Sequence, residues 1–121
     1  MASQIDNNFR SFSFASAISG NILVQADSAA NAAVAAVSPG YSIGVVQTDV
    51  ATGDMGTVKL FHPTQMGVVS GGGITAGLVV KADGNGKLVA STLTAGVVTV
   101  GIALANGEDG DVIEYAPKFN L

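Results

Sequence analysis

The sequence contains no cysteine and no tryptophan, and it is poor in charged residues. The absence of cysteine excludes disulfides, thiolate zinc sites and a cysteine nucleophile, and it leaves the redox state of the compartment open. Charged residues make up 12% of the 121 residues. Ordinary globular domains have about a quarter. A surface with so little charge predicts that protein partners cover much of it.

Basic residues are too few and too scattered to bind nucleic acid. The net charge is −4, and no two of the five basic residues are near enough in sequence to form a patch: Arg10, Lys59, Lys81, Lys87 and Lys118. We expect no nucleic-acid partner, because such binding depends on clustered positive charge. The uncharged stretches 60–80 and 88–107 contain polar residues and glycines, so neither is the run of about 20 apolar residues that a spanning helix needs. We expect no membrane partner and no signal peptide.

No group of residues in the sequence predicts catalysis, a metal or a cofactor. His62 is the only histidine, and no nucleophile pattern accompanies it. Residues 83–87 begin like a calcium loop, but Thr94 stands where such a loop has its bidentate glutamate, and a hairpin turn explains the glycines. Residues 108–111 form the sharpest acidic cluster, which is only a weak calcium candidate. We therefore expect a protein that is not an enzyme.

Alternating apolar residues, frequent turn residues and 16 glycines predict an all-β chain. Residues 11–18 alternate small polar with apolar side chains. Short β-rich runs follow at 22–24, 43–46, 57–61, 78–80, 87–90, 97–104 and 111–115. Turn residues such as Pro39-Gly40 separate these runs, which is typical of a small sandwich or barrel.

The chain also repeats itself. The features of residues 79–103 follow those of residues 23–46, and the likeness continues for about forty residues in each copy. The alignment pairs 78–80 with 22–24, Ala82-Asp83 with Ala26-Asp27, Gly101 with Gly44, Gly110 with Gly56, and Val112 with Val58. We predict two β halves related by a pseudo-twofold axis, about 19–62 and 75–116, with residues 67–77 between them. Each half is expected to need the other to close its core.

The repeat decides the structure predicted for an alanine-rich segment. Residues 27–38 alone would make a fair helix. The corresponding segment of the second copy contains Gly84 and Gly86, and each would cost about 1 kcal/mol inside a helix. Because equivalent segments should fold alike, both are predicted to be a turn followed by a strand.

Residues 1–12 lie outside both copies and are predicted to form an extended N-terminal arm, with residues 13–121 as a single β domain. The arm places apolar side chains and the only arginine among polar residues. Phe12 and Phe14 lie on one side of an alternating strand, which suits addition to the sheet edge of a neighbour. The residues expected to contact a neighbouring subunit or a shell are Ile5, Phe9, Arg10, Phe12 and Phe14.

The order of several motifs resembles a known protein family. The segments are ITAGLVVKADGNGKLV at 74–89, VGIAL at 100–104 and GDVIEY at 110–115. In this order they resemble the capsid decoration, or cement, proteins of tailed bacteriophages. The resemblance implies a non-enzymatic protein, often a homotrimer, that binds the major capsid protein on the outside of the virion after synthesis in the host cytoplasm. It brings no catalytic motif.

Two other interpretations remain open at the level of sequence. Biotinyl and lipoyl carrier domains also consist of two similar β halves with a lysine at a hairpin tip, and Lys87 stands beside such a tip. No Met-Lys-Met surrounds it, and the chain is about half as long again as a carrier needs. A structural module of a phage tail or fibre is the other alternative.

Overall fold

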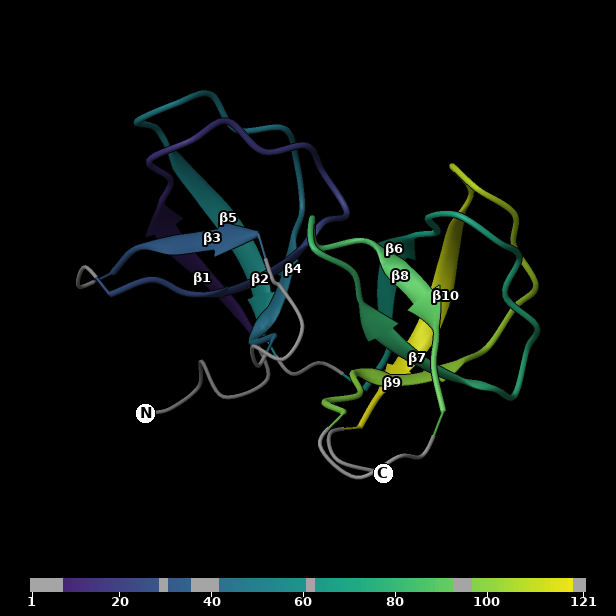
Figure 1. The fold of residues 1–121 in the computed structure, drawn as a ribbon. Coiled ribbons are helices and arrows are strands. Elements are labelled where there is room, and N and C mark those ends of the chain that lie inside the picture. The colour runs from purple at the N-terminus through teal and green to yellow at the C-terminus, as the bar shows by residue number, and fades with distance from the viewer. Residues whose placement is uncertain (1–7, 29–30, 36–41, 61–62, 93–96, 119–121) are drawn as a thin grey trace.

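The structure, a computed structural model, describes residues 8–28, 31–35, 42–60, 63–92 and 97–118. These residues form ten strands and no helix, so none of them belongs to a helix that could cross a membrane. The strands make two antiparallel five-stranded sheets that lie side by side (Figure 1). The prediction of an all-β fold is confirmed, and the architecture is consistent with a small β-sandwich.

The two sheets have the same strand order. The first contains β1 (Phe9–Ser13), β2 (Leu23–Ala26), β3 (Ala33–Ala35), β4 (Gly44–Val46) and β5 (Met55–Leu60), in the order β1-β5-β4-β2-β3. The second contains β6 (Gln65–Val68), β7 (Val79–Ala82), β8 (Leu88–Ala90), β9 (Gly101–Ala103) and β10 (Val112–Pro117), in the order β6-β10-β9-β7-β8. In each sheet an isolated parallel bridge joins the first and last strands, Ser13 to Ala32 and Val69 to Leu88, so both sheets curl toward closure.

Equivalent turns in the two halves use the same backbone conformation. Positive φ angles occur at three corresponding pairs of positions: Asn21 and Gly77, Asn31 and Gly86, and Gly53 and Gly110. Asparagine and glycine are the residues that accept this conformation at least cost. The chain therefore preserves the turns of the duplication although few residues are identical.

Gly44 and Gly101 hold equivalent sites, as the repeat predicts. Each begins an inner strand, and each pairs with both neighbouring strands of its sheet. A Cβ atom on Gly44 would collide with the backbone carbonyl of Lys59, and one on Gly101 would collide with that of Ala116. Glycine is needed at both sites because two backbones approach too closely for a side chain.

The register of the repeat in its last strand differs from the sequence alignment. Val46 pairs with Val58 in the first sheet, and Ala103 pairs with Tyr115 in the second, so Val58 corresponds to Tyr115 rather than to Val112. By the same register, Gly56 corresponds to Ile113 rather than to Gly110. The alignment was displaced by three residues because it matched two glycines that serve different purposes.

The boundaries of the halves also differ from the prediction. β1 pairs with β5 over its whole length, from Phe9 opposite Lys59 to Ser13 opposite Met55, so residues 9–12 belong to the first sheet and not to a separate arm. β6 belongs to the second sheet, so the connection between the halves lies before Gln65 rather than at 67–77. The alanine-rich segment contains strand β3, which agrees with the predicted turn and strand.

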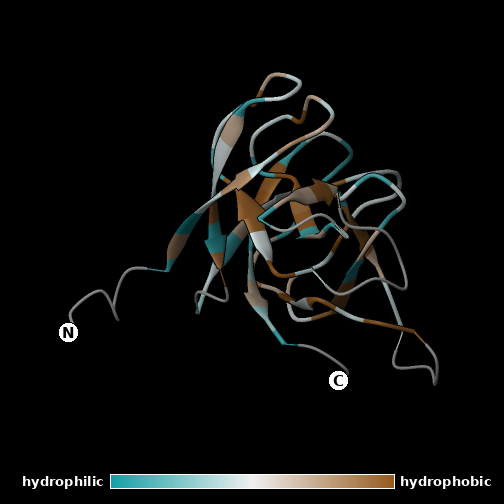
Figure 2. Cartoon of the chain, turned by 90° about the vertical axis from the view of Figure 1, so that its left-hand side faces the viewer, coloured by the Kyte–Doolittle hydropathy of each residue, from teal (hydrophilic) through white to brown (hydrophobic). Residues whose placement is uncertain are grey.

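Each half has a core of its own. One hydrophobic cluster, which includes Phe12, Phe14 and Val58, fills the first half, and another, which includes Leu88, Ile113 and Tyr115, fills the second. The most hydrophobic segments gather in the interior of the molecule (Figure 2). The prediction that each half needs the other to close its core is therefore wrong in this form, because there are two clusters rather than one. The second cluster nevertheless includes Leu23 and Val45 of the first half.

Candidate interaction surface

Two of the five predicted contact residues are buried within the chain itself. The side chains of Phe12 and Phe14 are almost fully buried in the core of the first half. Gly56 lies directly opposite Phe12, and Phe14 occupies the space that a side chain on Gly56 would fill. The expectation that these phenylalanines contact a neighbour is therefore corrected: both pack in the core of their own chain, and Phe14 fills the space beside Gly56.

The other predicted residues have different surroundings. Phe9 is 51% exposed at the edge strand β1. Arg10 is also exposed, but its Nη2 donates a hydrogen bond of 2.5 Å to Oδ1 of Asn31, and its guanidinium lies 4.5 Å from the centre of the Phe12 ring. Arg10 thus links β1 to the turn between β2 and β3 through its hydrogen bond to Asn31. Ile5 lies outside the described residues.

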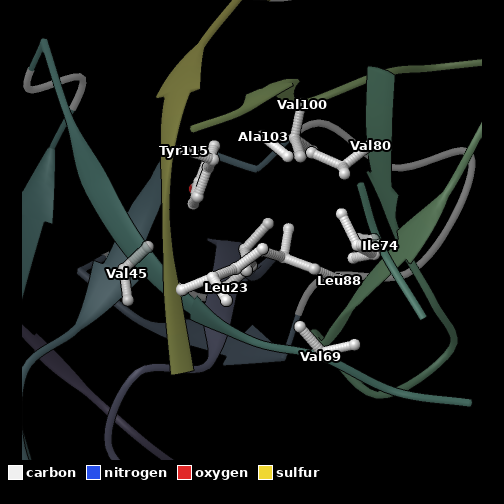
Figure 3. Packing of buried hydrophobic residues seen from close by; sticks show 11 residues of the cluster. Leu23, Val45, Val69, Ile74, Val80, Leu88, Val100, Ala103 and Tyr115 are labelled. Carbon is white, nitrogen blue, oxygen red and sulfur yellow. The ribbon is translucent and has the colours of Figure 1, made fainter. Parts of the chain in front are cut away.

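A leucine of the first half, Leu23, packs into the second half where the two halves meet. In the second half, the cross-strand pair that corresponds to Phe12 and Gly56 is Gly67 and Ile113, so the large and small residues are exchanged. A Cβ on Gly67 would lie 2.6 Å from Cδ1 of Leu88 and 3.5 Å from Cδ1 of Leu23. Leu23 and Leu88 therefore take the space beside Gly67, and Figure 3 shows them side by side. The amide of Leu23 also donates a 2.8 Å hydrogen bond to the carbonyl of Gly86.

This joint is not a twofold contact. Leu23 pairs with Val45 across the first sheet, and both are fully buried because the second half covers them. The corresponding pair in the second sheet is Val79 and Ile102, and neither is fully buried or belongs to the cluster of the first half. A twofold axis would bury both pairs alike. The halves are therefore arranged head to tail, which corrects the predicted pseudo-twofold relation.

The head-to-tail arrangement leaves one sheet face of the second half without cover from the described residues. Ile102 lies between Val79 and Ala116, and Leu104 and Val112 share that face because they follow the alternation of β9 and β10. Leu104 is 47% exposed and Val112 is 45% exposed. We call this surface the open face; it consists of Val79, Ile102, Leu104, Val112 and Ala116. Exposed apolar patches of this kind mark contact sites for proteins or ligands.

Several acidic residues of the described chain accept hydrogen bonds from backbone amides in turns. No group of three or more His, Asp or Glu side chains comes together among the residues that the structure describes. Asp109 Oδ1 accepts a hydrogen bond from the amide of Gly71, and Asp111 Oδ2 accepts one from the amide of Glu108. The candidate calcium cluster at 108–111 is thus a hydrogen-bonded turn. His62 lies outside the described residues.

The turn at Asp83 is held in the same way. Its Oδ1 accepts hydrogen bonds from the amides of Asn85 at 2.7 Å and Lys87 at 3.0 Å. Partial burial acts to raise the pKa of Asp83, but these bonds, a hydrogen bond from Ser70 and the charge of Lys87 outweigh it and keep the pKa below its usual value. In the second core, burial raises the pKa of Tyr115. The lowered pKa of Asp83 reflects interactions that stabilise the turn, whereas the raised pKa of Tyr115 is a consequence of its burial.

Comparison with known proteins identifies a shared fold. No family model matches the chain, and no curated protein gives a significant match. Among solved structures, the chain is similar to the head fiber gp8.5 N base of bacteriophage phi29, with 18% sequence identity and a TM-score of 0.75. The match covers 91% of this chain and 94% of that one. The chain and this part of a phage head fiber have the same fold.

The open face escaped the sequence analysis, although its strands were predicted. Val79 and Ile102 read like any half-buried strand residues, because only the packing of the first half shows which side of the repeat is covered. A signal was present in the alignment, which placed Val79 on Leu23 and Gly101 on Gly44. Once Leu23 is known to be buried by the second half, that alignment identifies the equivalent surface around Val79, which the structure leaves uncovered.

Proposed function

We propose that the protein is a bacteriophage structural protein that binds the outer surface of an assembled capsid and stabilises the contacts between capsomers. The observation that supports the proposal most strongly is the fold shared with the phi29 head fiber N base over nearly the full length of both chains. The sequence resemblance to capsid decoration proteins independently points to the same setting. The major capsid protein is the proposed partner, and the virion exterior is the proposed location.

The open face is the surface that we assign to this attachment. Its five residues are apolar, and Leu23 and Val45, the equivalents of Val79 and Ile102 in the first half, are covered by the second half. Glu114 stands between Val112 and Ala116 on β10, and Lys81 follows Val79 by two residues on β7, so both lie at the face. An apolar centre with a few charges is the usual composition of a protein–protein contact. As the resemblance to decoration proteins implies, we propose that a homotrimer presents three such faces.

The proposed role is mechanical and needs no enzyme activity or cofactor. A protein that binds the assembled shell, and not its separated parts, stabilises the shell by mass action. The stabilisation therefore rises with occupancy and levels off when every site is filled. Nucleic acid and membrane have no part in this proposal.

The proposal is tested on particles of the phage that encodes the chain. Antibodies against the protein should label the outside of intact heads, and particles stripped of it should rupture at a lower temperature than complete ones. A Leu104→Lys variant should rebind stripped particles at least about tenfold more weakly, which corresponds to about 1.4 kcal/mol. The matched control is Met55→Lys, because Met55 is 61% exposed on the first half and lies away from the open face.

Labelling of tails, or of no part of the particle, would contradict the capsid-surface role. Equal rebinding of the Leu104→Lys and Met55→Lys variants, with both folded by circular dichroism, would show instead that the attachment surface lies elsewhere.

The base of a fibre is a second candidate, favoured by the fold that the chain shares with the N base of the phi29 head fiber. It differs in one observable property, since a fibre base would carry further protein outward from the shell.

Nothing favours the carrier-domain alternative, because Lys87 follows the tip of its hairpin and is half-buried, with its amide bonded to Asp83. Carrier domains instead present the modified lysine freely to other enzymes.

A further inference from the structure

A small cavity lies where the two halves meet. It has a volume of about 10 Å³ and is lined by residues of both halves: Ser42, Ile43, Gly44, Gln65, Val100, Tyr115 and Pro117. Cavities of roughly 10–15 Å³ are the smallest that hold one water molecule. Such a cavity remains dry when it is apolar and holds water when polar groups face it, so its content depends on its lining.

The lining includes a buried polar atom that has no partner. Gln65 is almost completely buried, and its Nε2 donates a hydrogen bond of 2.5 Å to the carbonyl of Lys59 in the first half. Its Oε1 is buried and has no hydrogen-bond partner. The orientation of the amide is fixed by the Lys59 carbonyl, because a carbonyl accepts from NH₂ and not from oxygen. An orphaned acceptor beside a cavity indicates a bound donor.

A second polar group lines the cavity from the other half. Ser42 is buried, and its Oγ donates a hydrogen bond of 3.1 Å to the carbonyl of Gly44. A serine hydroxyl has two lone pairs beyond the proton that it donates, so Ser42 can accept a further bond. One water has two protons, which match Gln65 Oε1 and Ser42 Oγ as acceptors.

We propose that one buried water molecule occupies this cavity and bridges Gln65 of the second half to Ser42 of the first. The bridge adds a polar link to the apolar contact that Leu23 makes on the other side of the joint. Together with the Gln65–Lys59 hydrogen bond, it holds the second half in a fixed orientation relative to the first. The inference concerns the joint alone and is independent of the proposed attachment to capsids.

The test is a crystal structure at high resolution together with amide hydrogen exchange. The expected result is density for one water within hydrogen-bonding distance of both Gln65 Oε1 and Ser42 Oγ. The amide of Leu23, which bonds across the joint to Gly86, reports the rigidity of the joint by its exchange rate. Ser42→Ala keeps the Gln65–Lys59 bond and removes one partner of the water, and we expect the Leu23 amide to exchange at least threefold faster.

Gln65→Met removes both the orphaned acceptor and the bond to Lys59, and we expect at least tenfold faster exchange at Leu23. The matched control is Gln47→Met, because Gln47 also donates through Nε2 to a backbone carbonyl, that of Val45. The control should leave the water in place. An empty cavity in the wild-type crystal, or a water that contacts only one of the two halves, would overturn the proposal. Unchanged Leu23 exchange in Ser42→Ala would show that no bridge stiffens the joint.

Discussion

Replacing Leu23 by alanine should destabilise the protein far more than replacing Val79, although the two residues hold equivalent positions in β2 and β7. Leu23 is fully buried in the core of the second half, beside Leu88 and Gly67. Val79 lies on the open face and is partly exposed. The pair therefore measures the head-to-tail joint directly, because a twofold joint would make both substitutions costly.

The magnitudes follow from the buried carbon atoms. Leucine to alanine removes three of them, and at about 0.8 kcal/mol each the lost transfer free energy is about 2.4 kcal/mol. The cavity left beside Gly67, which has no side chain to fill it, brings the expected loss to about 3–4 kcal/mol. Valine to alanine removes two carbons from a half-buried site and leaves no closed cavity, so about 0.8 kcal/mol is expected.

Thermal unfolding followed by circular dichroism, with urea unfolding as a second measurement, separates these outcomes. For a chain of this size, 1 kcal/mol lowers Tm by about 3–5 °C, so Leu23→Ala should lower it by about 9–20 °C and Val79→Ala by about 2–4 °C. If both variants lose the same stability, the second half does not cover the first as described. If Leu23→Ala loses less than about 1 kcal/mol, the joint contributes little to folding.

Three further predictions concern single turns and strands. In urea titrations, Gly44→Ala and Gly101→Ala should each lower the free energy of unfolding by about 1–3 kcal/mol, because the new Cβ meets a backbone carbonyl. The control Gly84→Ala has open space around the new Cβ and should change the free energy of unfolding by less than about 0.5 kcal/mol. Because the pKa of Asp83 is lowered in the fold, its ionised form stabilises the protein above pH of about 4, and this stabilisation is lost as the pH falls through the folded pKa. The stability advantage of wild type over Asp83→Asn should therefore shrink between pH 6 and 3, and an advantage that grows on acidification would show that the pKa is raised instead. Arg10→Ala should cost about 0.5–1 kcal/mol through the lost contact with the Phe12 ring, and Arg10→Lys should restore part of it; no loss in Arg10→Ala would show that the contact contributes nothing.

The local features of the fold could be predicted from the sequence because their causes are local. Period-two alternation and turn residues mark the strands, and equivalent glycines at 44 and 101 mark the close approach of two backbones. The slip in the last strand shows the limit of this reasoning. Gly56 is required because Phe14 and Val50 fill the space beside it, whereas Gly110 is required by a positive φ angle. Both residues are glycine in the sequence, and only the structure shows that they are required for different reasons.

The position of residues 9–12 could not be predicted, because the partner of β1 lies far along the chain in β5. An alternating segment at the N-terminus suits pairing with any free strand edge, whether in the same chain or in a neighbour. What decides between them is the first core, in which Phe12 and Phe14 are buried and in which Gly56 leaves room for Phe14. The phenylalanines and the glycine can both be read from the sequence, but the strand register that brings them together cannot.

The described residues at the far end of the first half differ from those with which the second half contacts the first. The second half contacts the first through Gly67, Val68 and Gly86, whose side chains are absent or apolar. At the corresponding places the first half has Phe12, Ser13 and Asn31. Phe12 fills the gap, Ser13 Oγ donates a 3.3 Å hydrogen bond to the Asn31 carbonyl, and Arg10 binds the Asn31 side chain. Because polar caps end repeat arrays, this end does not favour head-to-tail addition of a second copy. If the protein attaches to a capsid shell, as we propose, the open face at the other end is the apolar surface available for that contact.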